Sequence, residues 1–530
     1  MMAANFKKYV GLIIKRDRII SAIWLLALAA FAYLLAALYP SLFPDELSMH
    51  GIIATTNTPP MIAMMGPVYG IDSINIAILM SQECLIWFAI AVIVMNIFFV
   101  NRYTRVDEEL GRHEMLVALP VGRLTNSISI VFLSFLLNLL VAGFIAFLTL
   151  ASGIEGVNLC GALVYGFSIG MQGFVFAMIT LLAAQLFSTA RDSMGVAFAL
   201  MGISYLLRAY GDMNNHWLSL LSPMGLGLKV EAFYANNAIP IFLLFAEAMV
   251  LAGVALWVNA HRDSGAGIFP ARKGKADASR FLQTPLGFAW RLSRNGFYAW
   301  AIGIFAIGAS YASVIGELDN FVEGNDMIKL MLQGNGGTAQ LVDAFIALLN
   351  GLFALLIAIP VINCINRIRN EEKRGRLELI AATAVSPKKI MGNFIIIAVF
   401  ETVVLTFLGA FGLYAAAASS GLVAFHEILK SALVYLPALF VMLSFAAFLV
   451  GLFPKFTSLI WVLFGYSFII FYFGKLFNVP DFFVKLSPFG HIPQLPVQEF
   501  SATPLIIMTA IACFFCTLGV HYFNKRDLNN

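Results

Sequence analysis

The sequence predicts an all-α, polytopic membrane protein with about twelve transmembrane helices. Of its 530 residues, 60% are hydrophobic and only 12% are charged, and the mean hydropathy is +0.87. Soluble proteins contain about 45–50% apolar and about 25% charged residues, so a water-soluble fold could not bury this much apolar surface. The composition therefore excludes a soluble enzyme, a nucleic-acid-binding protein and a disordered scaffold as descriptions of the whole chain.

The positions of the helices follow from apolar runs that are bounded by charged residues, Pro or Gly. A helix needs about 20 apolar residues to cross the hydrocarbon core of a bilayer. The expected spans are residues 19–39, 76–100, 127–151, 159–187, 194–211, 239–259, 296–315, 341–365, 391–418, 430–452, 458–474 and 504–523.

The distribution of Lys and Arg predicts the orientation of these spans. An even number of spans places both termini on one side, and the loops on that side hold 27 of the 33 Lys and Arg residues. Such a bias marks the cytoplasmic side, so both termini are expected in the cytoplasm. Residues 3–18 place apolar residues on one side of a helix between cations, which fits a short helix in the membrane interface. A positive anchor with accidental spacing explains the same residues.

Two kinds of site find no support in the residue pattern. The five cysteines lie in or at the edges of apolar spans, which indicates neither a disulfide framework nor a metal site. The seven His residues are scattered, and none forms a metal-ligand pair of known spacing. We therefore expect no metal and no cofactor in this chain.

An internal repeat divides the chain into two halves. Between Arg105 and Arg123, seven of nineteen positions are identical to the residues 264 positions later. A second match pairs Leu221-Ser-Pro-Met-Gly225 with Leu486-Ser-Pro-Phe-Gly490 at a shift of 265. We expect two parallel six-helix halves, residues 1–259 and 296–530, joined by a cytoplasmic linker at 260–295.

The repeated loops, residues 101–126 and 366–390, are the main candidate site. Acids precede bases by four residues at Glu108–Arg112 and Glu372–Arg376, and Arg105–Glu109 and Arg374–Glu378 have the same spacing, so each loop is expected to be a helix with internal ion pairs. A Gly inside each loop suggests either close backbone approach or a break between two short helices. Repetition of this charge pattern favours a docking surface for another protein over a solvated connector. The candidate residues are Arg105, Glu108, Glu109, Gly111, Arg112 and Glu114 in the first loop, and Arg369, Glu371, Glu372, Gly375, Arg376 and Glu378 in the second.

These motifs resemble the permease subunit of ABC type-2 exporters, in particular the fused twelve-helix branch described as exporters of polyketide antibiotics. Members have a similar Arg-x-x-Glu-Glu-x-Gly-Arg-x-Glu stretch after the second helix of each half, and a Leu-Ser-Pro-x-Gly element before the last. The second copy departs from the family at Lys373 and Ala384. The resemblance implies a coupling helix in each loop, two copies of a cytosolic ATPase that binds ATP and Mg, and a location in the bacterial cytoplasmic membrane. The sequence has no phosphate-binding GxxxxGK[ST] loop, so this chain is not expected to be an enzyme.

Ionisable residues inside the spans are the second candidate site, because charge in the bilayer core is unfavourable. Glu83, Glu247 and Glu401 could line a polar path for the substrate, or could equally hydrogen-bond across helices. Arg208 is expected to extend toward the outer interface.

The leading function is therefore an ATP-driven exporter of a hydrophobic or amphipathic compound such as an antibiotic, or a lipid. The alternative is an ion-coupled drug antiporter of the major facilitator type, whose loop after the second helix is loosely similar to Asp107–Arg112. A membrane-embedded enzyme would need a cluster of His, Asp or Glu at one interface, and the sequence shows none.

Overall fold

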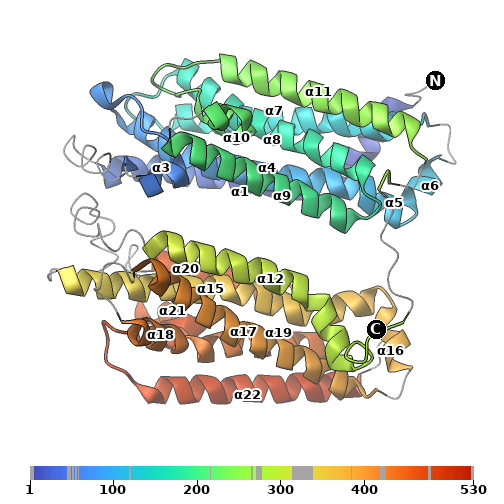
Figure 1. Ribbon diagram of the computed structural model, residues 1–530, viewed down its shortest axis with the longest axis vertical. Helices are drawn as coiled ribbons and strands as arrows, with labels where there is room; N and C mark the ends of the chain where they lie inside the picture. The colour runs from blue at the N-terminus through green and yellow to red at the C-terminus, as the bar shows by residue number, and fades with distance from the viewer. Residues whose placement is uncertain are drawn as a thin grey trace. The chain divides into compact units, whose positions relative to one another are not determined.

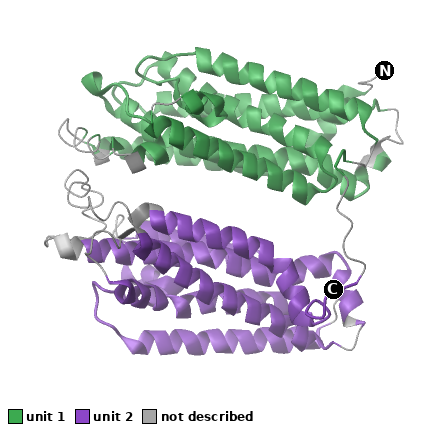
Figure 2. Ribbon diagram, in the orientation of Figure 1, with its two compact units in different colours: residues 1–274 green, residues 275–530 purple. Residues whose placement is uncertain are grey.

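The chain folds into two helical units, Met1–Gly274 and Lys275–Asn530 (Figure 2). The computed structural model describes residues 5–43, 49, 53, 56–57, 59–117, 121–214, 217–263, 267–269, 277–312, 338–382, 385–417, 424–474 and 479–526. Across these residues the regular structure is helical, with one isolated bridge between Phe187 and Phe269 and no strand. The predicted all-α, polytopic fold is confirmed.

Unit 1 is built around helix α8, which packs against α4, α7 and α11 (Figure 1). Glycines bring α8 close to α7: a Cβ on Gly166 would lie 2.3 Å from the carbonyl oxygen of Ala142. In a lipid bilayer the hydrophobic effect does not drive helices together, so their association depends on close packing, which small residues allow. The long helices of the unit are α1 (Phe6–Leu42), α4 (Ile76–Asn101), α7 (Thr125–Ala151), α8 (Leu159–Leu186), α9 (Ala190–Met213) and α11 (Ile239–His261), and the short ones are α3 (Pro59–Met65), η1 (Ile71–Ser73), η2 (Arg102–Val106), α5 (Asp107–Glu109), α6 (Arg112–Val117), η3 (Trp217–Leu221) and α10 (Pro223–Leu228).

Unit 2 repeats this plan with its own set of helices. In both units the first long helix packs on the third, the second on the fourth, and the fourth on the sixth. The elements of unit 2 are α12 (Pro285–Ala312), α15 (Thr338–Lys373), α16 (Arg376–Ala381), α17 (Pro387–Ala417), α18 (Phe425–Leu433), α19 (Leu436–Leu452), α20 (Leu459–Phe473), α21 (Asp481–Leu486), η6 (Pro488–His491) and α22 (Ala502–Lys525). The short helices α6 and α16 differ in position by 264 residues, the shift of the sequence repeat.

The repeated Leu-Ser-Pro-x-Gly element has the same role in both units. The side chain of Ser222 accepts from the amide of Gly225 and caps α10, and Ser487 accepts from the amide of Phe489 and caps η6. A Cβ on Gly225 or Gly490 would lie 2.1 Å from a backbone oxygen, of Ser219 and Val484 respectively. Ser is therefore required as a cap and Gly for close approach, which explains why both copies keep them.

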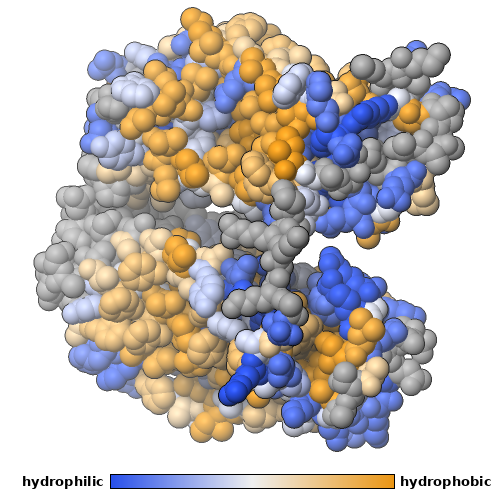
Figure 3. Space-filling view, turned by 45° about the vertical axis from the view of Figure 1, so that its right-hand side comes forward, coloured by the Kyte–Doolittle hydropathy of each residue, from blue (hydrophilic) through white to orange (hydrophobic). Residues whose placement is uncertain are grey.

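The number of spans is not confirmed as twelve. Ten helices among the described residues are long and apolar enough to cross a membrane. The predicted spans 296–315 and 458–474 correspond to α12 and α20, which are not among the ten. Helix α20 has only 15 residues, a length of about 22 Å against a hydrocarbon core of about 30 Å. Figure 3 shows hydrophobic residues over the middle of the helices of each unit and hydrophilic residues toward their ends.

The N-terminal region and the linker differ from the sequence-based expectation. Residues 6–18 are not a separate interfacial helix, because α1 runs as one helix from Phe6 to Leu42. Its first turns pack on the protein: Val10 and Ile13 are buried, and the hydroxyl of Tyr9 donates to Asn126 of α7. Residues 285–295 of the predicted linker form the start of α12, and the basic run 272–275 lies outside the described residues.

Candidate functional site

The two repeated loops each contain a break in the helix at a glycine. In unit 1, α4 continues through η2 and α5, and Gly111 then adopts a φ of +68° before α6 begins. In unit 2, α15 ends at Lys373 and Gly375 adopts a φ of +67° before α16. No described atom lies within 4 Å of a Cβ placed on either glycine. The glycines are thus needed for their left-handed backbone, so the predicted helix break is correct and the alternative of close approach is wrong.

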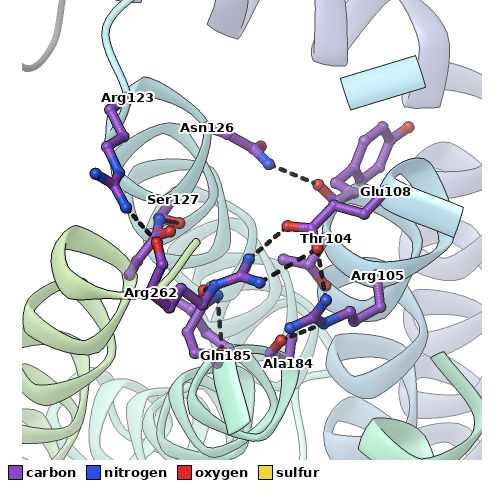
Figure 4. Close-up of polar contacts among 12 residues, drawn as sticks. Thr104, Arg105, Glu108, Arg123, Asn126, Ser127, Ala184, Gln185 and Arg262 are labelled. Atoms are coloured by element: carbon purple, nitrogen blue, oxygen red, sulfur yellow. Dashed lines mark hydrogen bonds and ion pairs between the residues drawn. The ribbon is translucent and has the colours of Figure 1, made fainter. Parts of the chain in front are cut away.

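Beside the break of unit 1, Glu108 lies between two arginines (Figure 4). Arg105 donates to Glu108 at 2.7 Å, and Arg262, the residue that follows α11 as its C-cap, donates to it at 2.5 Å. Arg105 also donates to the carbonyl of Ala184, and Arg262 donates to the side chain of Gln185 at 2.7 Å. At most 8% of each of the three charged side chains is exposed. The cluster therefore ties the last helix of the unit to the loop.

Unit 2 contains the same cluster at the equivalent positions. Arg369 donates to Glu372 at 3.0 Å, and Arg526, the residue that follows α22 as its C-cap, donates to both carboxylate oxygens of Glu372 at 2.7 and 2.9 Å. Only 2% of the Glu372 side chain is exposed. A bidentate pair between Arg and a carboxylate is stronger than a single hydrogen bond and fixes the relative orientation of the two side chains. We call these two groups the Arg–Glu–Arg clusters, and the end of each unit at which they lie the loop end.

Two of the ion pairs predicted within the loops, Glu108–Arg112 and Glu372–Arg376, are wrong. Arg112 pairs with Asp107 at 3.1 Å rather than with Glu108, and Arg376 pairs with Glu371 at 2.6 Å rather than with Glu372. The prediction considered only neighbours on one helix, whereas Glu108 and Glu372 point inward to a helix end 154 residues away.

Glu109 has a partner that the sequence did not predict. Its carboxylate accepts from the backbone amide of Ala190 at 2.6 Å. Ala190 is the first residue of α9, where unpaired amides favour a negative charge. In the second loop, Arg374 and Glu378 are both exposed.

Four residues of these networks were missed by sequence reasoning. Arg262 and Arg526 complete the clusters, and Asp107 is 3% exposed and binds Arg16 of α1 at 2.7 Å. A signal for two of them was present, because Arg262-Asp263 and Arg526-Asp527 match at the same shift of 264. At the same shift Arg16 corresponds to Arg280, and Asp107 corresponds to another acid, Glu371.

The short helices α6 and α16 expose an equivalent pair of residues. Glu114 and Glu378 are exposed, and the residues that follow them, Met115 and Leu379, are 66% and 73% exposed. Each loop thus presents a carboxylate next to a large apolar side chain, on a short helix beside a buried Arg–Glu–Arg cluster.

A sequence relative accounts for the whole chain. Over 526 residues the chain is 31% identical to the multidrug efflux system permease protein Rv1217c of Mycobacterium tuberculosis (strain ATCC 25618 / H37Rv), with 98% of this chain and 94% of the relative covered. The chain belongs to this family of efflux permeases. The family model for the C-terminal domain of multidrug efflux system permease Rv1217c matches residues 282–524, which lie in unit 2. The expected exporter permease is thereby confirmed at the level of an efflux permease.

The three glutamates expected along a substrate path lie on α4 and α11 of unit 1 and on α17 of unit 2. Glu83 accepts from the hydroxyl of Tyr39 at 2.6 Å, and Glu247 is half-buried on α11. Glu401 is 2% exposed on α17 and interacts with Cys364 and Arg367 of α15 in unit 2. Glu83 and Glu401 thus have partners on neighbouring helices, and a role of the three in a substrate path stays a prediction.

Arg208 does not extend toward the interface as expected. The permease buries it completely, and its guanidinium donates to the carbonyls of Ile62, Ala63 and Met64, the closest at 2.6 Å. Asp212, one turn later on α9, lies 3.7 Å from the guanidinium. Arg208 therefore holds the last turn of α3, whose carbonyls have no partner within that helix.

Proposed function

We propose that this chain is the transmembrane permease subunit of an ATP-driven ABC exporter that moves a hydrophobic or amphipathic, drug-like compound out of a bacterial cell. Two copies of a separate ATPase, which binds ATP and Mg, would dock at the loop ends of the two units. In this proposal the loop ends and both termini lie in the cytoplasm, and the chain lies in the cytoplasmic membrane. The observation that carries it is the exposed Glu–apolar pair of α6, repeated on α16.

The exposed pairs, rather than Glu108 and Glu372, form the docking surface. Glu108 and Glu372 are buried and already bind two arginines each. Met115 and Leu379 are exposed apolar side chains at the charged loop end of their own unit, where a partner protein would bury them. Interfaces commonly surround such apolar anchors with polar and charged groups. Glu114 and Glu378 supply that charge, and a basic cleft on the ATPase is the matching surface.

The clusters give the docking surface a mechanical connection to the membrane domain. Each cluster links the loop to the end of the last helix of its unit, α11 or α22. A shift of the short helix on ATP binding would therefore reach two spans at once, the helix that precedes the loop and the last helix. Packed elements with two arrangements transmit such shifts.

The proposal is tested with the tagged chain purified from its native membrane. We expect a small ATPase to copurify at two copies for each permease, as counted by quantitative mass spectrometry. The double variant Glu114→Arg with Glu378→Arg should weaken ATPase binding by tenfold or more, because reversing charges at an interface costs about 1.4 kcal/mol or more. Asp72→Arg, an equally exposed acid on η1, is the matched control and should leave binding unchanged.

Two results would contradict the proposal. One is recovery of the chain without an ATPase, together with transport that stops when the proton gradient is dissipated, which would favour the ion-coupled antiporter. The other is full ATPase binding by the double variant.

A further inference from the structure

A cavity of about 290 Å³, separate from the Arg–Glu–Arg clusters, opens on the surface of unit 1 among α1, α4 and α9. Its walls are mainly apolar and include Trp24, Phe98 and Met194. Its polar lining comes from Asp17, Asn101 and Arg102, at the loop ends of α1 and α4. Phe98 is 46% exposed, so the apolar wall continues to the surface of the unit.

Asn101, which lines this cavity, has an unused hydrogen-bond acceptor. Its side chain is 2% exposed, and its amide nitrogen donates to the carbonyl of Ala190 at 3.2 Å and to the sulfur of Met194 at 3.7 Å. Its oxygen Oδ1 has no partner among the described residues. A buried acceptor without a hydrogen bond is unfavourable, so the site favours a ligand that donates one.

Asp17 offers a carboxylate whose cationic partner can be exchanged. Asp17 is 4% exposed and accepts from Arg102 at 3.0 Å, from the hydroxyl of Tyr103 at 2.8 Å and from the hydroxyl of Ser21. Tyr103 is buried and stays in place, whereas 40% of the Arg102 side chain is exposed. Because Asp17 is buried and Arg102 reaches it from the exposed side, a ligand cation can take the place of Arg102 while the buried carboxylate stays paired.

The apolar walls fit the rest of such a ligand. The faces of aromatic rings attract cations, and Trp24, Phe98 and Phe99 border the cavity. Met95 and Met194 are flexible and polarisable side chains that adapt to apolar groups of different shapes. A site with a few polar groups and flexible apolar walls selects ligands by their charge and accepts apolar groups of varied structure.

We propose that this cavity binds amphipathic compounds that carry a protonated amine. The ammonium donates to Oδ1 of Asn101 and to the carboxylate of Asp17, and the apolar body lies against Trp24 and Phe98. The inference rests on the proposed export function only in so far as the bound compound is the cargo, since the binding itself needs no ATPase.

The experiment measures binding of dansylcadaverine, a fluorescent primary amine, to the purified full chain in nanodiscs without ATPase. Binding is followed by energy transfer from tryptophan to the dansyl group. The N-acetylated form of the probe has the same apolar body without the charge, and we expect it to bind about tenfold more weakly or worse.

Two variants test the polar groups of the cavity. Asn101→Leu and Asp17→Asn should each weaken binding of the amine about tenfold or more, and should leave the acetylated probe unaffected. Asn259→Leu, a half-buried amide at the same end of unit 1 outside this cavity, is the matched control and should bind normally.

Equal binding of the amine and its acetylated form would overturn the inference. So would normal amine binding by a folded Asn101→Leu variant, which keeps the Asp17 network intact if Asp17→Asn fails to fold. Because no ATPase is present, either result leaves the proposed ATPase partnership untouched. If the permease binds amines but no ATPase copurifies with it, the proposed amine site stands and the proposed ATP-driven export is wrong.

Discussion

The Arg–Glu–Arg cluster of unit 1 lies among polar side chains, and its counterpart in unit 2 lies among apolar ones. A polar cavity of about 320 Å³ borders Glu108 and Arg262. In unit 2 the guanidinium of Arg526 lies 5.1 Å from the ring centre of buried Phe523. At the shift of 264, four polar positions of unit 1 correspond to buried apolar residues of unit 2: Asn126 to Ile390, Ser127 to Met391, Gln185 to Leu449 and Asn259 to Phe523.

This comparison shows which residues of the clusters the two units share and which have diverged. Both keep the three charged residues that join the last helix to the loop, while the side chains around them have diverged. In unit 1 the arginines bind further acceptors, Ala184 and Gln185. In unit 2, the Nε groups of Arg369 and Arg526 have no partner among the described residues. Both units therefore share the connection between the loop and the last helix. We expect substitutions in the cluster to destabilise the protein more in unit 2 than in unit 1.

The largest effect on stability is expected when Phe523 of unit 2 is replaced by its counterpart in unit 1, an Asn. We expect Phe523→Asn to destabilise the protein by about 4 kcal/mol or more, because it leaves a cavity and an unpaired amide in a fully buried position. The reciprocal Asn259→Phe, beside an existing cavity, should cost less than about 2 kcal/mol. Thermal unfolding of the purified variants measures both. Equal losses would show that the two environments are energetically alike.

Removing the central carboxylate should also affect the units unequally. Glu372→Ala leaves two arginines unpaired in apolar surroundings, and we expect a loss of about 3–5 kcal/mol. Glu108→Ala should cost about 1–3 kcal/mol, because the adjacent polar cavity has room for water and the acceptors Ala184 and Gln185 remain for Arg105 and Arg262. The exposed Glu114→Ala is the control, with a change within about 0.5 kcal/mol. A larger loss from Glu108→Ala than from Glu372→Ala would reverse the comparison.

The smallest effect concerns a feature that the units share. Gly111→Ala and Gly375→Ala should each destabilise their loop by about 1–2 kcal/mol, because an L-residue with a side chain is strained at positive φ. Hydrogen exchange should accelerate in residues 112–117 and 376–381 by similar factors. Gly143→Ala, at an open helical position of α7, should instead be neutral or stabilising. Acceleration in one loop alone would mean that the two breaks differ.

The features that could be predicted from the sequence are those that depend only on residues close to them in the chain. Apolar runs predicted ten of the spans, because each needs only its own length and hydropathy to cross a bilayer. The glycine breaks were predictable as one of two alternatives, because a repeated Gly in a charged helix needs a local reason. The other two predicted spans, α12 and α20, are not among the ten, and α20 has only 15 residues.

The sequence by itself determined the all-helical membrane fold, the two-fold repeat and the position of the repeated loops. Only the tertiary structure decided which charges pair: Glu108 binds Arg262 across 154 residues, and Asp107 binds Arg16 across 91. It also decided that Arg208 is buried against the end of α3 rather than directed outward. The physical reason is that hydropathy and helix propensity act locally, whereas a buried ion pair requires two side chains from distant segments to leave solvent together.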